Sequence, residues 1–366
     1  MSRVGIITMH KVINYGSFFQ AYALQHIIQN LGHECIIIDY EYPNEYQYLQ
    51  GVRQKGKRSL IDRIIQYLGL TPARRKYKIF HRAWKTYFIL SKHYASHSDL
   101  FRNPPIFDYY ITGSDQVWNP NFTKGDNAFF LEFTPLGSRR ISYASSFSVS
   151  QIDEPYYSQY TKYLLKYQYL SVRESSGKTL IKQMLGKDSS LVLDPTLLIT
   201  SEQWIKFASS KIDRWFGKHY ILVYLLNYAF HAEECVKDIV EKIRRNTGLD
   251  VIVISTKQTT IDSTKTIIDV GIEEFIHLFS NAEYVVTSSF HGTAFAINFG
   301  KRLVSVTNNK SLDDRQNSIL RLLHLERCIA TSADSVDIVN CETLCARSLL
   351  DELRSDSINY LKKTLS

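Results

Sequence analysis

One short segment, Ser288-Ser-Phe-His-Gly-Thr293, gathers the residue types best suited to chemistry. Continuous apolar runs lie on either side of it, at 284–287 and 303–306, and predict strands covered on both faces. Between them we predict a tight polar turn and a short helix over 293–299. The amides and positive dipole end of that helix favour an anion, and a histidine beside them can donate a proton. The candidates are Ser289, His291, Gly292 and Thr293; a purely structural histidine in the turn is the alternative.

Several other predicted strands, all in the first half of the chain, also end in small polar residues. They lead into Thr112-Gly-Ser-Asp-Gln116, Ser142-Tyr-Ala-Ser-Ser146 and Ser171-Val-Arg-Glu174. The chain opens with a strand at 4–9, an amphipathic helix at 18–31 and a strand at 34–39, which predict a Rossmann-type βαβ unit. Because this unit lacks the G-x-G-x-x-G fingerprint, it does not indicate dinucleotide binding.

A second α/β unit begins near residue 201, with predicted strands at 220–226 and 251–255 and helices at 232–245 and 273–280. We therefore predict an α/β protein of two Rossmann-like, doubly wound domains that face each other across a cleft. The predicted domains are residues 1–200, with a basic helical insertion at 51–100, and residues 201–335. Residues 336–366 are predicted to form a helical segment that packs back on the first domain.

The composition is that of a globular protein. Of the 366 residues 44% are hydrophobic, yet no apolar run reaches the ~18–20 residues that span a bilayer. The first strand starts almost at Met1, so we predict no signal peptide. Five scattered cysteines are typical of a reduced compartment, and we expect a cytoplasmic protein. Cys341 and Cys345 lack the further ligands that zinc requires, and no DxD motif occurs, so we expect no metal.

The net charge of +8 is concentrated in one segment. Between Gly51 and Lys92 there are twelve Lys or Arg residues and one acidic residue, Asp62, so the rest of the chain carries −3. Apolar and aromatic residues alternate with these charges at helical spacing, which predicts a helix pair near anionic lipid head groups. A helical insertion whose apolar face packs on its own domain is the alternative. We expect no nucleic-acid partner, because no recognition motif accompanies the charge.

Six segments, taken together and in this order, resemble the polysaccharide pyruvyl transferase family. They are Asn14-Tyr-Gly-Ser-Phe-Phe-Gln-Ala-Tyr-Ala-Leu24, Thr112-Gly-Ser-Asp-Gln-Val-Trp-Asn119, Ser142-Tyr-Ala-Ser-Ser146, Ser171-Val-Arg-Glu174, Leu193-Asp-Pro195 and Ser288-Ser-Phe-His-Gly-Thr293. The resemblance implies a fold similar to two-domain GT-B glycosyltransferases, phosphoenolpyruvate as the donor, and a cyclic pyruvate ketal on a sugar diol as the product. It also implies a sugar or lipid-linked oligosaccharide acceptor, in bacterial surface or capsular polysaccharide biosynthesis at the inner face of the cytoplasmic membrane.

On the donor side, the resemblance assigns roles to residues far apart in the chain. His291 is similar to the histidine of the family's donor site, and Arg173 to the arginine of its Val-Arg-Glu motif. An ion pair between Arg173 and Glu174 is the structural alternative. A donor-site lysine matches Lys310, while Lys301 is the competing candidate. The turn residues around His291 complete the predicted donor side.

On the acceptor side, Asp115 is predicted either as a catalytic base or as the N-cap that closes its loop. Asn14, Tyr15 and Gly16 are predicted to contact the acceptor, although Asn14 and Gly16 are also explained by loop geometry. Ser145 is predicted to line the cleft and not to act as a nucleophile, because no His or Asp is paired with it.

The implied donor has chemistry that suits these residue types. Phosphoenolpyruvate carries a phosphate and a carboxylate, so cations and helix-end amides can hold it, and no cofactor or metal is required. Ketal formation needs a proton on the methylene carbon, attack of a hydroxyl on C2, loss of phosphate and closure by a second hydroxyl. Two alternatives remain, a GT-B enzyme with a nucleotide-sugar donor and a non-catalytic carbohydrate-binding homologue. Donor binding separates them: phosphoenolpyruvate, a uridine diphosphate sugar, or neither.

Overall fold

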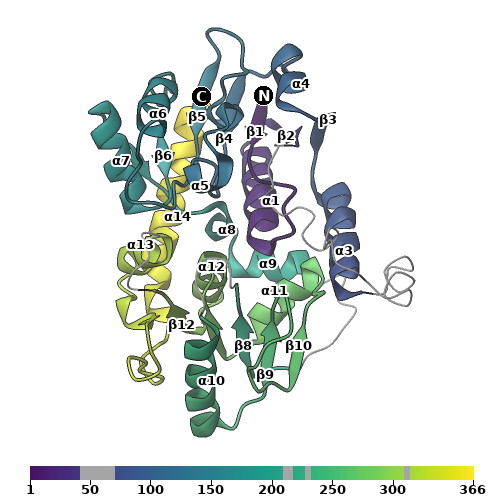
Figure 1. Ribbon diagram of the computed structural model, residues 1–366, viewed down its shortest axis with the longest axis vertical. Coiled ribbons are helices and arrows are strands. Elements are labelled where there is room, and N and C mark those ends of the chain that lie inside the picture. The colour runs from purple at the N-terminus through teal and green to yellow at the C-terminus, as the bar shows by residue number, and fades with distance from the viewer. Residues whose placement is uncertain (42–70, 209–216, 227–231, 309–313) are drawn as a thin grey trace.

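Two parallel β-sheets, one above the other in Figure 1, form the framework of this computed structural model. The structure describes residues 1–41, 71–208, 217–226, 232–308 and 314–366. Within both sheets all neighbouring strands pair in parallel, and helices cover the sheet faces. The predicted α/β architecture of two Rossmann-like domains is confirmed.

The first sheet has the strand order β3-β2-β1-β4-β5. Its strands are β1 (Arg3–Ile7), β2 (Glu34–Tyr40), β3 (Leu90–Tyr94), β4 (Tyr109–Thr112) and β5 (Arg139–Ser142). The order reverses between β1 and β4, and doubly wound sheets bind ligands outside the carboxyl ends of the strands at such a switch point. The segments that leave β1 and β4 there contain Asn14 and Asp115.

The second sheet has the strand order β10-β9-β8-β11-β12-β13. Its strands are β8 (Ile221–Tyr224), β9 (Val251–Ile254), β10 (Lys265–Ile267), β11 (Tyr284–Thr287), β12 (Arg302–Val306) and β13 (Ile329–Ala330). Here the order reverses between β8 and β11, and the segment after β11 carries Ser289 and His291. Each domain therefore presents predicted site residues at its own switch point.

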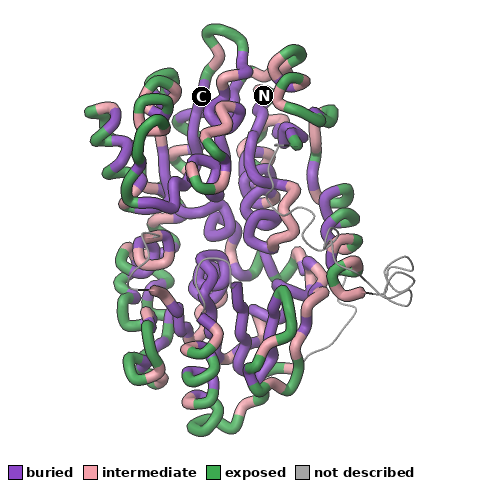
Figure 2. The backbone as a smooth tube through the Cα atoms, viewed as in Figure 1, coloured by how far each residue is buried: buried purple, intermediate pink, exposed green. Residues whose placement is uncertain are grey.

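Helix α1 (Tyr15–Asn30) lies between the two sheets and is buried along nearly its whole length (Figure 2). It begins three residues before the predicted start, because the Asn14 side chain accepts hydrogen bonds from the Gly16 and Ser17 amides and caps it. The prediction of an amphipathic helix is wrong, since both of its faces pack on protein.

The second domain meets α1 through aromatic side chains. The Phe19 ring lies 5.2 Å, between centroids, from Trp204 of α9 (Ser201–Ala208). It lies at the same distance from Phe295 of α12 (Phe290–Asn298). These contacts join the cores of the two domains across α1.

Helix α3 (Pro72–Tyr87) lies within the basic segment and also bridges the domains. Its apolar side chains Phe80, Ala83 and Trp84 are buried, so this part of the insertion packs on its own protein. Arg75 binds Asp269 of the second domain, and the Tyr87 hydroxyl donates to Glu273 there. The rest of the predicted lipid-facing segment, residues 51–70, lies outside the described residues.

Helix α14 (Arg347–Thr364) returns from the second domain to the first, as the yellow ribbon in Figure 1 shows. Its Ser357 Oγ accepts a hydrogen bond from the Leu193 amide, and the Tyr360 hydroxyl donates to the Ser142 carbonyl, both at 3.0 Å. The last helix therefore lies against the edge of the first sheet.

The remaining elements surround this framework. They are α4 (His97–Arg102), α5 (Pro120–Thr123), α6 (Tyr156–Leu164), α7 (Ser175–Leu185), α8 (Pro195–Leu198), α10 (Glu233–Thr247), α11 (Ile272–Asn281), α13 (Arg315–Leu322), and the two-stranded sheet of β6 (Ser171–Val172) and β7 (Ser190–Leu191), with 3₁₀ turns at Asn127–Phe130, Glu326–Cys328 and Leu344–Ala346. All five cysteines are free thiols. Within the described ranges, no helix has the length and hydropathy needed to cross a bilayer.

Candidate functional site

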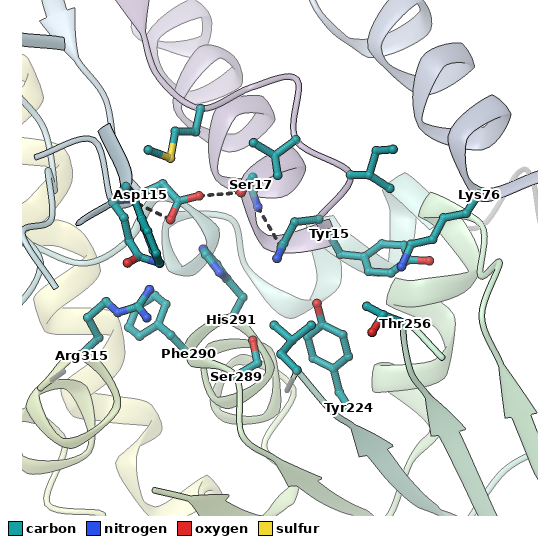
Figure 3. Close-up of a pocket in the computed structure, with 17 residues that line it drawn as sticks. Tyr15, Ser17, Lys76, Asp115, Tyr224, Thr256, Ser289, Phe290, His291 and Arg315 are labelled. Carbon is teal, nitrogen blue, oxygen red and sulfur yellow. Dashed lines mark hydrogen bonds between the residues drawn. The ribbon is translucent and has the colours of Figure 1, made fainter. Parts of the chain in front are cut away.

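A cavity of about 250 Å³ opens between the domains, where the segments after β1, β4, β8 and β11 come together (Figure 3). The starts of α1 and α12, together with α3, α5, α13 and the segment after β9, complete its wall. It is lined by Met9, Val12, Ile13, Asn14, Tyr15, Ser17, Lys76, Asp115, Gln116, Phe122, Tyr224, Leu226, Thr256, Ser289, Phe290, His291 and Arg315. Both switch points therefore supply residues to one cavity.

His291 reaches this cavity from the first turn of α12. The helix begins three residues earlier than predicted, because Ser289 takes the N-cap position and its Oγ accepts a hydrogen bond from the Gly292 amide at 3.3 Å. His291 thus lies on the helix, and only 6% of its surface is exposed. Gly292 lets α12 lie close on β11, since a Cβ there would stand 2.3 Å from Oγ1 of Thr287.

The His291 ring also lies against the start of α1, in the other domain. A Cβ built on Gly16 would stand 2.0 Å from Nδ1 of His291, far inside any real contact. Glycine at position 16 therefore makes room for the imidazole. Two residues that we predicted on opposite sides of the cleft are direct neighbours.

Behind His291 lies a fully buried carboxylate, Asp194. Its Oδ2 accepts hydrogen bonds from Ser114 Oγ at 2.7 Å and Arg173 Nη1 at 2.9 Å, and lies 3.7 Å from Nε2 of His291. Burial alone would raise the pKa of Asp194, but His291 and Arg173 hold that pKa well below its usual range. Asp194 is therefore an anion that faces the imidazole.

Asp115 lies beside His291 on the wall of the first domain (Figure 3). Its backbone is left-handed, with φ of 76°, and its carboxylate accepts hydrogen bonds from Ser17 Oγ at 2.6 Å and the Gln116 amide at 3.0 Å. Burial raises the pKa of Asp115, but Arg173, His291 and Ser17 lower it by more, so it falls below its ordinary value. The side chain is thus an ionised hydrogen-bond acceptor at the cavity wall, and it is the N-cap of no helix in the part of the chain that the structure describes.

Arg173 lies behind the cavity wall, with its side chain fully buried. It binds Asp194 and approaches Asp115 at 3.5 Å, and its guanidinium lies 4.4 Å from the centre of the Phe290 ring. Its nitrogen Nε lies 3.8 Å from Glu174, so the ion pair that we considered as the alternative is a minor contact. Arg173 thus neutralises two carboxylates and supports one residue of the lining.

Most of the chain matches the model of a known family. A family model described as polysaccharide pyruvyl transferase matches residues 14–310, which include both switch-point segments and Asp194. The chain belongs to the polysaccharide pyruvyl transferase family. No curated protein matches it.

Solved structures with similar folds include two of UDP-GlcNAc 2-epimerase from Methanocaldococcus jannaschii. One, in complex with UDP-GlcNAc and UDP, is 14% identical to this chain and has a TM-score of 0.50. The match covers 96% of this chain and 92% of the epimerase chain. The other is 13% identical and has a TM-score of 0.51, and the match covers 93% of this chain and 91% of the epimerase chain. At these identities the likeness shows the fold alone, the GT-B arrangement of two Rossmann-like domains.

Of the predicted site residues, those on the cavity wall are Asn14, Tyr15, Asp115, Ser289 and His291. Others support the wall from behind. Ser145 Oγ donates to the Thr112 and Gly113 carbonyls, and Thr293 Oγ1 pairs with Ser305 Oγ. Neither Ser145 nor Thr293 lines this cavity.

The two candidate lysines have different outcomes. Lys310 lies outside the described residues, and its contact with the donor stays a prediction. Lys301 donates a hydrogen bond to the Ser280 carbonyl at 2.6 Å, near the end of α11, and does not line the cavity. Lys301 therefore places its charge at the C-terminal end of α11, whereas its position after Gly300 predicted a charge at the end of the preceding helix, α12.

The sequence interpretation missed three charged residues of the site. Arg315 and Lys76 line the cavity. Arg315 begins a helix after a loop that has no predicted secondary structure, and Lys76 lies within a run of basic residues. Asp194 belongs to a motif that carried the family resemblance, yet received no role. Across the described ranges, no three His, Cys, Asp or Glu side chains gather in a way that could hold a metal ion.

Proposed function

We propose that this protein transfers pyruvate from phosphoenolpyruvate to a sugar diol as a cyclic ketal, in bacterial surface or capsular polysaccharide biosynthesis. Membership of the pyruvyl transferase family supports the class of reaction. The observation that carries the proposal is His291, which faces the cavity at a helix N-terminus with the Asp194 carboxylate behind it. This pair suits an acid that must protonate a bound, anionic substrate.

The donor binds at the His291 end of the cavity. Arg315 and the amides of the first turn of α12 face the phosphate and carboxylate, and charged donors here replace the water that those anions lose. Lys310 is a further donor ligand by family resemblance. Since these groups balance the substrate charge, the reaction uses no metal or other cofactor.

The reaction then moves protons from His291 and from both acceptor hydroxyls. The His291 imidazolium gives its proton to the methylene carbon, C2 becomes electron-poor, and an acceptor hydroxyl attacks it. That hydroxyl becomes acidic as its bond to C2 forms, so even the weakly basic Asp115 carboxylate can take its proton. Phosphate leaves, a second hydroxyl closes the ring, and the two hydroxyl protons are balanced by the new methyl group and hydrogen phosphate.

Arg173 acts through other residues in this scheme. It keeps Asp194 and Asp115 ionised and holds Phe290 in place, so it is a positioning residue. Asn14 and Tyr15 line the acceptor side, where Asn14 also fixes the start of α1. The acceptor is a sugar or lipid-linked oligosaccharide, and the basic exposed face of α3 keeps the protein at the inner face of the cytoplasmic membrane.

Phosphate release from phosphoenolpyruvate, measured with galactoside, glucoside and mannoside acceptors, tests the proposal. We expect acceptor-dependent release that His291→Ala lowers by ~10²–10⁴-fold. His81→Ala, an exposed histidine on α3, is the matched control and should retain full activity. EDTA should leave the rate unchanged.

Calorimetric titrations with phosphoenolpyruvate and with a uridine diphosphate sugar complete the test. Binding of the nucleotide sugar alone would replace the proposal with a GT-B glycosyltransferase, and binding of neither would favour a non-catalytic homologue. Loss of activity in EDTA, restored by magnesium, would overturn the metal-free scheme.

A further inference from the structure

Lys76 reaches the cavity from α3, on the other side of Tyr15 and Tyr224 from His291 (Figure 3). Only 7% of its surface is exposed, whereas its neighbours Arg75 and Lys78 are exposed on the same helix. The ammonium lies 4.9 Å from the centre of the Tyr15 ring, a cation–π distance. The Lys76 side chain is therefore buried within a run of basic residues whose neighbouring members, Arg75 and Lys78, are exposed.

The ammonium of Lys76 is poorly compensated where it lies. It makes no hydrogen bond or ion pair with the residues that the structure describes. The carboxylate that acts on it electrostatically, Asp269, forms an ion pair with Arg75. Burial lowers the pKa of Lys76 to about 8, so most of it is still charged at neutral pH. A buried cation on a cavity wall is stabilised by an anion that enters the cavity.

The position of Lys76 decides which substrate carries that anion. In phosphoenolpyruvate the phosphate and the carboxylate are both attached to C2, so both stay close together at the His291 end. Figure 3 places Arg315 and Lys76 at opposite ends of the cavity, with Tyr15 and Tyr224 between them. The cavity thus has a cationic side chain at each of two separate ends, and phosphoenolpyruvate supplies an anion only to the His291 end.

We propose that Lys76 binds a phosphate or diphosphate group carried by the acceptor saccharide. The assignment to the acceptor rests on the proposed function, whereas binding of a phosphate group at Lys76 does not. Tyr15, predicted on the acceptor side, would then lie between the charged group and the reacting hydroxyls. A phosphorylated acceptor would be recognised at both of its ends, by Lys76 at the phosphate and by the groups around Asp115 at the diol.

Direct binding tests Lys76 without any reliance on turnover. Inorganic pyrophosphate is titrated into protein saturated with phosphoenolpyruvate, or into protein alone if the donor does not bind. Lys76→Met should weaken pyrophosphate binding by about 10- to 100-fold, as expected for loss of a charged partner, and Lys76→Arg should restore part of it. Affinity for phosphoenolpyruvate should change less than about twofold. Lys78→Met, on the exposed face of α3, is the matched control.

Kinetics with one saccharide in several forms then identifies the group. Lys76→Met should raise KM about 10-fold or more for the phosphorylated forms, and leave kcat and the KM of the methyl glycoside within about twofold. A lower KM for the farnesyl diphosphate ester than for the uridine diphosphate ester would identify a lipid carrier, and the reverse a nucleotide. Unchanged pyrophosphate binding in Lys76→Met, or an equal loss of phosphoenolpyruvate affinity, would overturn the proposal.

Discussion

The two ends of the cavity differ in how far their charged side chains are paired with other protein groups. At the His291 end, Asp194 accepts hydrogen bonds from Ser114 and Arg173, and Asp115 accepts one from Ser17. At the other end, an aromatic ring lies beside the Lys76 ammonium, which makes no hydrogen bond within the described part of the chain. At one end the charged side chains pair mainly with one another, and the other end holds a charge that the protein compensates only in part, through an aromatic ring and the field of Asp269.

This difference separates side chains that keep the site around His291 in a fixed geometry from Lys76, which we propose binds a ligand. A balanced buried network keeps its shape before the substrate arrives, which is what a proton donor requires. A buried ammonium without a hydrogen-bond partner costs stability and is retained where binding requires it. Substitutions at the first end should therefore reduce both activity and stability, while loss of Lys76 should reduce affinity and raise stability.

Asp194→Asn should have the largest effect of any substitution in this comparison. It leaves the buried Arg173 without its main charge partner, so we expect a loss of about 3–5 kcal/mol in the free energy of unfolding. Transfer should fall by about 10²-fold or more, because the His291 imidazole loses the carboxylate charge that it faces. Denaturant unfolding and phosphate release measure the two effects, with the exposed Asp188→Asn as control.

The same variant has a pH signature. Because the folded-state pKa of Asp194 is lowered, its contribution to stability is present above the unfolded-state value of about 3.9 and is lost as pH falls below it. The wild-type protein should therefore lose stability on acidification more steeply than Asp194→Asn. Parallel curves for the two proteins would show that Asp194 is not ionised in the fold.

Gly16→Ala tests whether the two domains fix His291 together. The new Cβ would overlap the imidazole, so we expect a cost of about 1–3 kcal/mol in the free energy of unfolding. Displacement of the ring by about 1 Å should lower transfer ~10²-fold. In the background of His291→Ala the same substitution should cost little, so a double-mutant cycle should show strong coupling. Additive effects would contradict the contact.

Lys76→Met should stabilise the protein by about 1–3 kcal/mol at pH 7, because it removes a buried charge whose pKa is about 8 instead of 10.5. Between these two pH values the unfolded chain binds more protons than the folded one, so wild-type stability should rise with pH. The variant should lack this rise. A lower melting temperature for Lys76→Met than for Lys78→Met would argue that the lysine is a structural residue.

The smallest effect concerns the outer face of α3. Lys78, Arg82 and Lys85 are exposed there, and each charge near an anionic membrane contributes about 1 kcal/mol. Replacing the three with Gln should weaken co-sedimentation with anionic vesicles at low salt and leave transfer to a soluble acceptor unchanged. Binding to zwitterionic vesicles should be weak in both proteins. Equal sedimentation of wild type and variant would remove this face from membrane contact.

The part of the site that sequence predicts is the part that local signals determine. Asp115, Ser289 and His291 follow directly from apolar runs that form central strands, and polar residues after such strands lie at the switch point of a doubly wound sheet. The helix starts were predicted late because Asn14 and Ser289 cap their helices. Capping by these residues was a local signal that the interpretation did not use.

The rest of the site depends on packing between distant segments. Arg173 follows a strand, as the others do, but only its contact with Asp194 and Asp115 places it behind the wall. Lys76 belongs to a run of basic residues, and which of them turns inward depends on how α3 rotates against the second domain. Arg315 opens a helix after a loop whose path the sequence does not determine. Lys76 and Arg315 carry no local pattern that distinguishes them from their neighbours.

The burial of α1 has a consequence for cooperativity. One continuous cluster of buried apolar side chains runs from Val4 and Phe19 in the first domain to Val286 and Phe295 in the second. Two domains that share a core in this way should melt as one unit, since neither can unfold without exposing the apolar surface of the other. Rigid rotation of the domains would also break the cluster. We therefore expect the two domains to keep their relative arrangement when substrate enters the cavity.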